Sequence, residues 1–294
     1  MKRIDLPPSE RRGILLMLSS VTLFAATSLL LSYAHTAHGI DGWVAATYRG
    51  IVGLAVVFAM QKRTGTLSLH HIFTRKLLFI RGLVGGLTIP VYYFCIMELG
   101  AGRAGIIAGV WPLFGAIFAA VLLKEQLYRS YFFYIGLTIV GMVAVLSGNG
   151  IGEAKLAFDL LALTGAAAGG FCVVLIRHLR HSESTSNIFA AQCVFTVIIA
   201  GGFSRTDLIV ADCTAQSILL IAAVTVVSAQ LCLTEAFRHL TVAKGSALQM
   251  LTPAATAGFS ILLLDETFSF YELLGSAAVL YGSYRIATHR AIKE

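Results

Sequence analysis

Charged residues are scarce in this chain, and acids are scarcer than bases. Only 13% of the 294 residues are charged, and 15 acids face 22 lysines and arginines. An ordinary soluble domain carries about 25% charged residues and about 45–50% apolar ones, whereas apolar residues make up 57% here. A chain of this length folded in water has too little polar surface to cover so much apolar surface. The composition therefore excludes an ordinary soluble domain.

Residue patterns typical of catalysis or metal binding are also missing. The five cysteines lie in separate segments without C-x-x-C spacing, which argues against a disulfide framework or a zinc site. His35 and His38 have H-x-x-H spacing, but no glutamate motif accompanies them. A role at a helix end or in solvent is favoured for both. The sequence predicts no catalytic residue, no metal and no cofactor.

Long apolar runs are what the chain has instead. Each run of about 20 residues is long enough to cross a bilayer as a helix whose backbone is satisfied internally. We therefore predict an all-α integral membrane protein. The ten predicted spans cover residues 14–34, 43–61, 77–97, 104–123, 130–147, 157–176, 187–203, 216–236, 242–264 and 270–287.

Lysines and arginines test this topology, because they accumulate in short cytoplasmic loops. With ten spans and a cytoplasmic N-terminus, only Arg103, Lys155 and Arg205 fall on the outer side, and Arg49 and Arg81 lie within or beside spans. Both termini are therefore predicted to be cytoplasmic. The net charge of +7 follows from these loops, which face anionic lipid headgroups, and carries no nucleic-acid signal.

The second half of the chain repeats the first at an offset of 141 residues. The matching pairs are Leu99 and Leu240, Pro112 and Pro253, Glu125 and Glu266, and Gly141 and Gly282. Equivalent positions are separated by an odd number of spans, so the two copies cross the membrane in opposite senses, as in secondary transporters. We predict two inverted five-helix repeats, covering residues 1–150 and 151–294.

These repeated blocks resemble the EamA-type permeases of the drug/metabolite transporter superfamily. The resemblance is carried by Trp111-Pro112-Leu113 and Leu123-Lys124-Glu125 in the first half, and by Thr252-Pro253 and Asp265-Glu266 in the second. It covers nearly the whole chain. It implies a ten-helix carrier of the inner membrane with a central cavity lined mainly by the third and fourth helices of each repeat. The implied activity is export or exchange of small metabolites such as amino acids.

Two prolines occupy equivalent places near the middle of the fourth and ninth spans. Pro112 and Pro253 each remove an amide donor and crowd the carbonyl four residues earlier, so each helix is expected to bend there. A freed carbonyl at membrane depth needs a partner from protein or from a water-filled cavity. We predict that both prolines are hinges beside the substrate path, although packed kinks without any contact to substrate are also common in membrane helices.

Polar and aromatic side chains at membrane depth are the candidate substrate-binding groups. Such groups are expensive facing lipid and are expected to point inward, where they either bind substrate or bridge helices. The candidates are Trp111, Gln249, Tyr93, Gln230, Tyr92, Gln192 and Arg49. Trp111 and Gln249 rank first because they adjoin the prolines. Arg49 either pairs with an anion or snorkels to backbone carbonyls.

Acids in the spans are few. The first span lacks the glutamate on which the small multidrug-resistance relatives rely, which disfavours proton-coupled cation efflux of that type. Glu235 is expected to pair locally with Arg238, and Glu98 to be solvated. A neutral lining with a cationic bias suits zwitterionic or anionic metabolites better than polycations.

The resulting hypothesis is an alternating-access transporter, not an enzyme, with a small-molecule substrate and membrane lipids as its partners. A monomer or a weak dimer is expected. The alternatives are a passive channel or sensor on the same fold, and an intramembrane enzyme. The enzyme is disfavoured because no nucleophile, paired acids or metal cluster converges at membrane depth.

Overall fold

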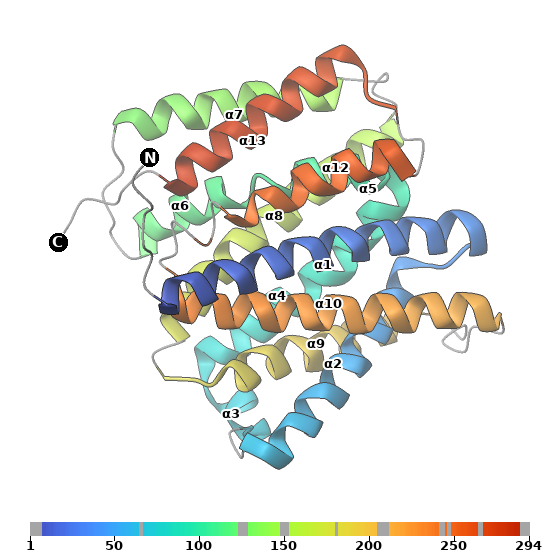
Figure 1. The fold of residues 1–294 in the computed structure, drawn as a ribbon, viewed down its shortest axis with the longest axis vertical. Helices are drawn as coiled ribbons and strands as arrows, with labels where there is room; N and C mark the ends of the chain where they lie inside the picture. Colours follow the sequence, from blue (N-terminus) through green and yellow to red (C-terminus); the bar gives the residue numbers. More distant parts are fainter. Residues whose placement is uncertain are drawn as a thin grey trace.

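The computed structural model is built from helices that lie side by side (Figure 1). It describes residues 8–64, 67–122, 129–147, 153–179, 182–204, 212–240, 245, 248–263 and 267–288. Within these ranges the elements are α1 (Pro8–His38), α2 (Gly42–Thr64), α3 (Leu69–Thr74), α4 (Lys76–Leu99), α5 (Ala101–Ala108), α6 (Trp111–Leu122), α7 (Arg129–Ser147), α8 (Glu153–Leu179), α9 (Thr185–Phe203), α10 (Cys213–His239), α12 (Leu251–Leu263) and α13 (Phe270–Thr288).

Within the described residues, seven stretches are long and apolar enough to cross a membrane. They correspond to α1, α2, α4, α5 with α6, α8, α9 and α10. A helix occupies each of the ten stretches predicted from sequence, but α7, α12 and α13 do not meet the same criterion. The all-helical membrane character is thus established, and the count of ten spans stays a prediction.

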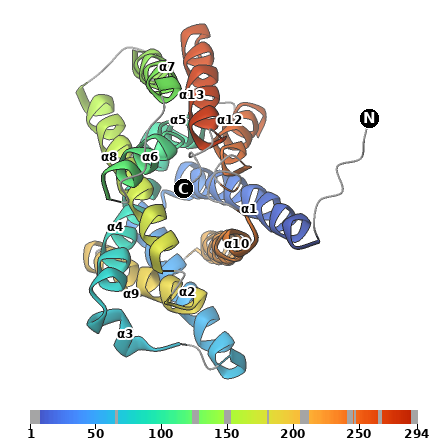
Figure 2. The ribbon, with the colours of Figure 1, turned by 90° about the vertical axis from the view of Figure 1, so that its left-hand side faces the viewer.

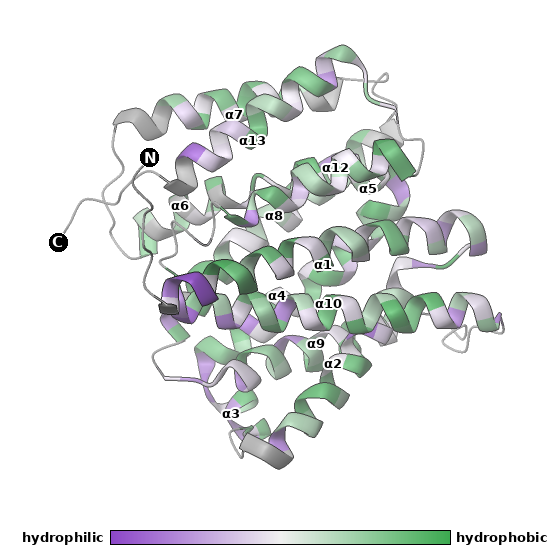
Figure 3. Ribbon diagram, viewed as in Figure 1, coloured by the Kyte–Doolittle hydropathy of each residue, from purple (hydrophilic) through white to green (hydrophobic). Residues whose placement is uncertain are grey.

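The helices consist largely of apolar residues (Figure 3), and many of their large apolar side chains are exposed. Leu262, Val121 and Phe270 are about 70% exposed or more, and they lie on three different helices. Exposure of this kind is unfavourable in water over so large an area but favourable against lipid. The outward face therefore has the character of a lipid-facing surface.

The two ends of the bundle are defined by where α1 and α10 begin and end. At the "His38 end", the Nδ1 atom of His38 lies 2.6 Å from a carboxylate oxygen of Asp212, just before α10. The N–H of Thr214 and the neighbouring His38 hold the pKa of Asp212 below its ordinary value. At the "His239 end", Gly13 of α1 packs against His239 and Leu240. Helices α1 and α10 are therefore antiparallel neighbours.

Equivalent helices of the two halves run in opposite directions. Helix α1 ends at the His38 end. Helix α8 starts there, because the carbonyl oxygen of Phe158 accepts a hydrogen bond from Cys95, near the end of α4, and Asp159 binds Arg103, near the start of α5. Likewise α4 finishes near the start of α2, where a Cβ on Gly42 would lie 2.9 Å from the amide nitrogen of Phe94. Helix α10 starts at that same end. This is the inverted relation that the repeat predicts.

Equivalent helices of the two halves also have equivalent packing partners. Helix α1 packs on α10, and its counterpart α8 packs on α4; α2 packs on α10, and its counterpart α9 packs on α4. Helices α7 and α13 pack on each other at one edge of the molecule (Figures 1 and 2). One packing scheme therefore serves both halves.

The contact between α7 and α13 shows the same equivalence in its individual close approaches. A Cβ on Gly141 would lie 2.7 Å from the carbonyl oxygen of Gly275, and a Cβ on Gly282 would lie 3.0 Å from that of Tyr134. These partners are themselves 141 residues apart. Each helix thus uses a glycine to let the other backbone approach closely.

The helices that carry Pro112 and Pro253 are broken near these prolines. Helix α5 ends at Ala108, residues 109–110 form a turn, and α6 starts at Trp111; in the second half, a turn at Met250 precedes α12. Both prolines thus stand in the first turn of a helix, where a missing amide donor removes no helical hydrogen bond. The expected bend within a continuous helix is replaced by a break just before each proline.

The connection between α2 and α4, which lies between two predicted spans, contains the short helix α3. Ile72 is its fully buried side chain, and the amide of Ser68 donates to the side-chain oxygen of Asn187 at 2.8 Å. A single buried residue leaves too short an apolar pattern for a sequence to reveal such a helix.

Candidate functional site

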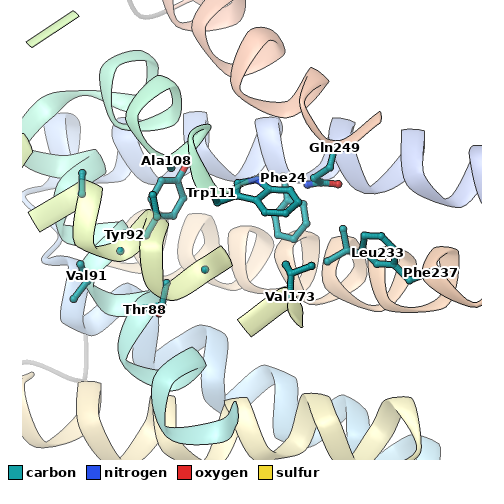
Figure 4. Close-up of a pocket in the computed structure, with 14 residues that line it drawn as sticks. Phe24, Thr88, Val91, Tyr92, Ala108, Trp111, Val173, Leu233, Phe237 and Gln249 are labelled. Atoms are coloured by element: carbon teal, nitrogen blue, oxygen red, sulfur yellow. The ribbon is translucent and has the colours of Figure 1, made fainter. Parts of the chain in front are cut away.

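A cavity of about 220 Å³ lies between the two halves of the bundle (Figure 4). Helices α1, α4, α5 and α6 of the first half line it, together with α8, α10 and Gln249 of the second. Most of its wall is apolar, with Phe24, Leu233 and Phe237 among the lining side chains. A cavity of this volume has room for several waters or for a small metabolite.

Two of the predicted binding residues, Trp111 and Gln249, line this cavity beside the two helix breaks (Figure 4). The Nε2 atom of Gln249 donates to the hydroxyl of Thr252 at 3.1 Å, while its Oε1 atom is buried without a partner among the described residues. Buried polar atoms are normally hydrogen-bonded. Gln249 therefore has one polar atom that the described residues leave without a hydrogen bond.

The breaks bring the two halves into direct contact. A Cβ on Gly109 would lie 3.1 Å from the Cγ atom of Pro253, and Gly105 packs against Thr256 and Pro253. Pro253 is buried. Pro112 has its backbone in α6, and its side chain lies outside the described residues. The prediction that both prolines adjoin the substrate path therefore rests on the position of the two breaks.

Small residues of α8 form a further part of the wall that was not predicted from sequence. Ala162, Gly165, Ala166 and Gly169 follow helical spacing along one face, and all of them line the cavity. A Cβ on Gly169 would meet nothing closer than the Cβ of Trp111, at 3.8 Å. Small residues at such spacing are also typical of close helix packing, so the sequence alone does not assign them to a cavity wall.

Tyr92 also lines the cavity, whereas Tyr93 and Gln230 lie behind its wall with Arg49. The Arg49 guanidinium donates to the Tyr93 hydroxyl and to Oε1 of Gln230, both at 3.4 Å, and its carbon lies 5.8 Å from the centre of the Tyr93 ring. Arg49 is therefore held by neutral side chains and does not snorkel to water.

Gln192 does not line the cavity either, since it binds Arg81. The Oε1 atom of Gln192 accepts from Nη2 of Arg81 at 3.0 Å, and its Nε2 atom donates to the carbonyl of Gly85 at 3.3 Å. Sequence reasoning left Arg81 aside because it lies only five residues after the start of α4, among other cations. Its burial, with 3% exposed, is visible only in the structure.

Charged side chains join the two halves near both ends of the bundle. Near the His38 end, the Arg103 guanidinium lies 2.8 Å from Asp159 and 2.9 Å from Glu272, with both carboxylates buried. At the opposite end, Arg75 lies 3.1 Å from the buried Glu183. The predicted pair between Glu235 and Arg238 is confirmed at 3.2 Å, and Glu98 is exposed as predicted.

The fold and the cavity together define a class of protein. A helical membrane bundle made of two oppositely oriented halves, with a shared cavity between them, is the architecture of a membrane transporter. The chain matches the EamA-like transporter family twice, over residues 11–147 and 156–288, and it belongs to that family.

Individual relatives are more distant. The chain is 24% identical over 195 residues to the pseudopaline exporter CntI of Pseudomonas aeruginosa, covering 65% of this chain and 67% of that one. It is 24% identical over 141 residues to solute carrier family 35 member G1 of Mus musculus, covering 47% of this chain and 37% of that one. A solved structure, described only as a crystal structure of protein, matches 94% of this chain and 97% of its own, with a TM-score of 0.66 and 17% identity. That likeness concerns the fold.

Proposed function

We propose that this protein carries small organic metabolites, such as amino acids or related compounds, across the inner membrane by alternating access. The observation that supports this most is the cavity shared by the two inverted halves, with Trp111 and Gln249 among its lining residues. Either half moving against the other changes the side to which such a cavity opens. Transport is secondary-active or facilitative, and the similarity to an exporter favours export.

The orientation follows from the distribution of lysine and arginine, which favours cytoplasmic termini. On this proposal residues 1–150 and 151–294 are the two moving units, the breaks before Pro112 and Pro253 are hinges, and the His38 end faces outward. The charged contacts of Arg103 and Arg75 then hold opposite ends of the bundle. They form and break in turn as the halves rock.

A passive channel on the same fold is the competing function, and solute counterflow separates the two. The purified protein is reconstituted in liposomes preloaded with one unlabelled amino acid or related metabolite, across a panel, with and without a proton gradient. A carrier accumulates labelled substrate transiently against its gradient, whereas a pore only equilibrates it. Counterflow with at least one member supports the proposal, and equilibration alone across the panel contradicts it.

A further inference from the structure

Two arginines are buried inside the bundle without any carboxylate among the described residues that contacts them. Arg49 is 5% exposed and Arg81 is 3% exposed. Arg49 contacts the neutral groups of Tyr93 and Gln230, and Arg81 contacts Gln192. Buried charges are normally paired, and an ionisable residue within a membrane span usually has a function. The described residues therefore provide no anion for either cation.

Arg81 is also short of hydrogen bonds. Its Nε and Nη1 atoms are buried without a partner among the described residues. A guanidinium presents its donors in a planar fork that matches the two oxygens of a carboxylate. An arginine that bonds one neutral amide through Nη2 and leaves two other nitrogens unused is a poor structural element. It is, however, well suited to receive an anionic group.

The direction of the Arg81 side chain supports a role inside the bundle. Helical side chains lean toward the N-terminus of their helix, which for α4 is the cytoplasmic side in the proposed orientation. The Arg81 guanidinium instead lies over Gly85, four residues further along α4, where a Cβ would collide with Nη1. Gln192 holds it there by bonding both Arg81 and the Gly85 carbonyl. Arg81 therefore points toward the middle of the membrane rather than toward water.

This location adjoins the cavity. Thr88, three residues after Gly85 on α4, lines the cavity, as does Val173 on α8. Cys172, the residue before Val173, lies within electrostatic range of Arg81, and Cys193 lies within range of both Arg81 and Arg49. The two cations thus sit behind one side of an otherwise apolar chamber and make its potential positive.

We propose that Arg81, with Arg49 reinforcing its field, binds the carboxylate of the transported metabolite, while the apolar chamber beside Trp111 holds the rest of that molecule. The inference rests on the proposed transport function and specifies its substrate class: small organic carboxylates with an apolar body. Arg81 is assigned the contact because it has the unused donors; it is not among the residues that line the chamber, so the carboxylate reaches it when the wall between them opens. Its burial without a partner is a stability cost that the bound carboxylate offsets.

The test is ligand binding to the purified protein in detergent, which needs no transport. The probes are N-acetyl amino acids with side chains from alanine to phenylalanine, each compared with its own carboxamide, which differs by the missing charge. The proteins are wild type, Arg81→Gln, Arg81→Lys and the control Arg12→Gln, which removes an exposed arginine at the start of α1. Affinity is read from ligand-induced changes in melting temperature and in tryptophan fluorescence.

Wild type and Arg12→Gln are expected to bind at least one carboxylate about tenfold more tightly than its carboxamide, whereas Arg81→Gln binds both alike and Arg81→Lys keeps part of the preference. Without ligand, Arg81→Gln is expected to melt about 2–4 °C higher than wild type, because an unpaired buried charge has been removed. No binding by any pair, equal binding of acid and amide by wild type, or equal stabilisation by chloride overturns the proposal. A preference retained in Arg81→Gln, or a lower melting temperature, also overturns it.

The outcome is separable from that of the counterflow assay. Carboxylate binding through Arg81 without counterflow would contradict the transport function and leave the anion site standing. Counterflow of a substrate without any effect of Arg81→Gln on the preference for carboxylate would contradict the anion site and leave the carrier standing.

Discussion

Gly169 and Gly170 are neighbours on α8 with opposite surroundings. A Cβ on Gly169 would have only the Cβ of Trp111 near it, at 3.8 Å, whereas a Cβ on Gly170 would lie 2.6 Å from the backbone of Gly115 and Trp111. One glycine therefore leaves space in the cavity, and the other allows α8 to pack on α6. A side chain added at each position has a different effect.

Gly169→Leu is expected to reduce the rate of counterflow by about tenfold, which corresponds to an activation free energy higher by about 1.4 kcal/mol. The added carbons occupy much of a cavity of about 220 Å³ and leave the helix contacts intact. The control is Ala157→Leu, an exposed position on the same helix, which should transport like wild type. A Gly169→Leu protein with an unchanged rate would show that substrate does not pass through this cavity.

The sequence identified candidate binding residues by their residue type, but it did not reveal which cations are buried. Trp111, Gln249 and Tyr92 were predicted to bind substrate, and all three line the cavity. Arg81 was set aside because a cation near a span end is ordinary in a sequence. Only packing against Gly85 and Gln192 shows that its guanidinium turns inward.

At the scale of helices, the breaks before Pro112 and Pro253 are the features that distinguish α6 and α12 from the longer spans. A proline in the first turn of a helix prevents that helix from extending backward, because its ring crowds the preceding residues. Each proline therefore favours the break that precedes it.

Pro112→Ala and Pro253→Ala are each expected to slow counterflow severalfold while changing the melting temperature little. Alanine restores an amide donor and lets the helix continue into the break, which stiffens the proposed hinge. Initial rates in liposomes and thermal melts of the same preparations measure the two effects. Rates equal to wild type in both variants would refute the hinge assignment.

The contact between α7 and α13 makes a second prediction at this scale. Gly141→Ala is expected to destabilise the protein by about 1–3 kcal/mol, since its Cβ would lie 2.7 Å from a backbone oxygen of α13. Gly136→Ala on the same helix is the control, because nothing lies within 4 Å of its Cβ position. Thermal melts compare the two, and equal stability would mean that α7 and α13 do not pack in this way.

The sequence predicted where helices lie better than how they are interrupted. Apolar runs placed a helix at every predicted span, because a backbone in lipid must satisfy its own hydrogen bonds. The turn at residues 109–110 was missed, since hydropathy continues unchanged through Gly109 and Val110. Helix α3 was missed because Ile72 alone signals its buried side.

At the scale of the whole molecule, the Arg103 cluster joins α5 of the first half to α8 and α13 of the second. One guanidinium there serves two buried carboxylates, Asp159 and Glu272. The desolvation of such a cluster offsets much of its attraction when it is complete, but losing one member is costly because a buried charge is left uncompensated. It is thus positioned to hold the two halves together near the His38 end.

Arg103→Gln is expected to destabilise the protein by about 3–5 kcal/mol, because two buried carboxylates lose their cation. Adding Asp159→Asn should recover part of that loss, a coupling that a double-mutant cycle measures in thermal melts. Arg238→Gln, which removes the exposed partner of Glu235, should change stability by about 1 kcal/mol or less. Additive effects of Arg103→Gln and Asp159→Asn would argue against a shared cluster.

The central claim is that two copies of one helical unit cross the membrane in opposite senses around a common cavity. Labelling of single cysteines at positions 124 and 265, in a protein freed of its five native cysteines, tests it most directly. A membrane-impermeant thiol reagent applied to intact cells should label position 265 and reach position 124 only after the membrane is opened. Labelling of both positions from the same side would contradict the inverted repeat and the account built on it.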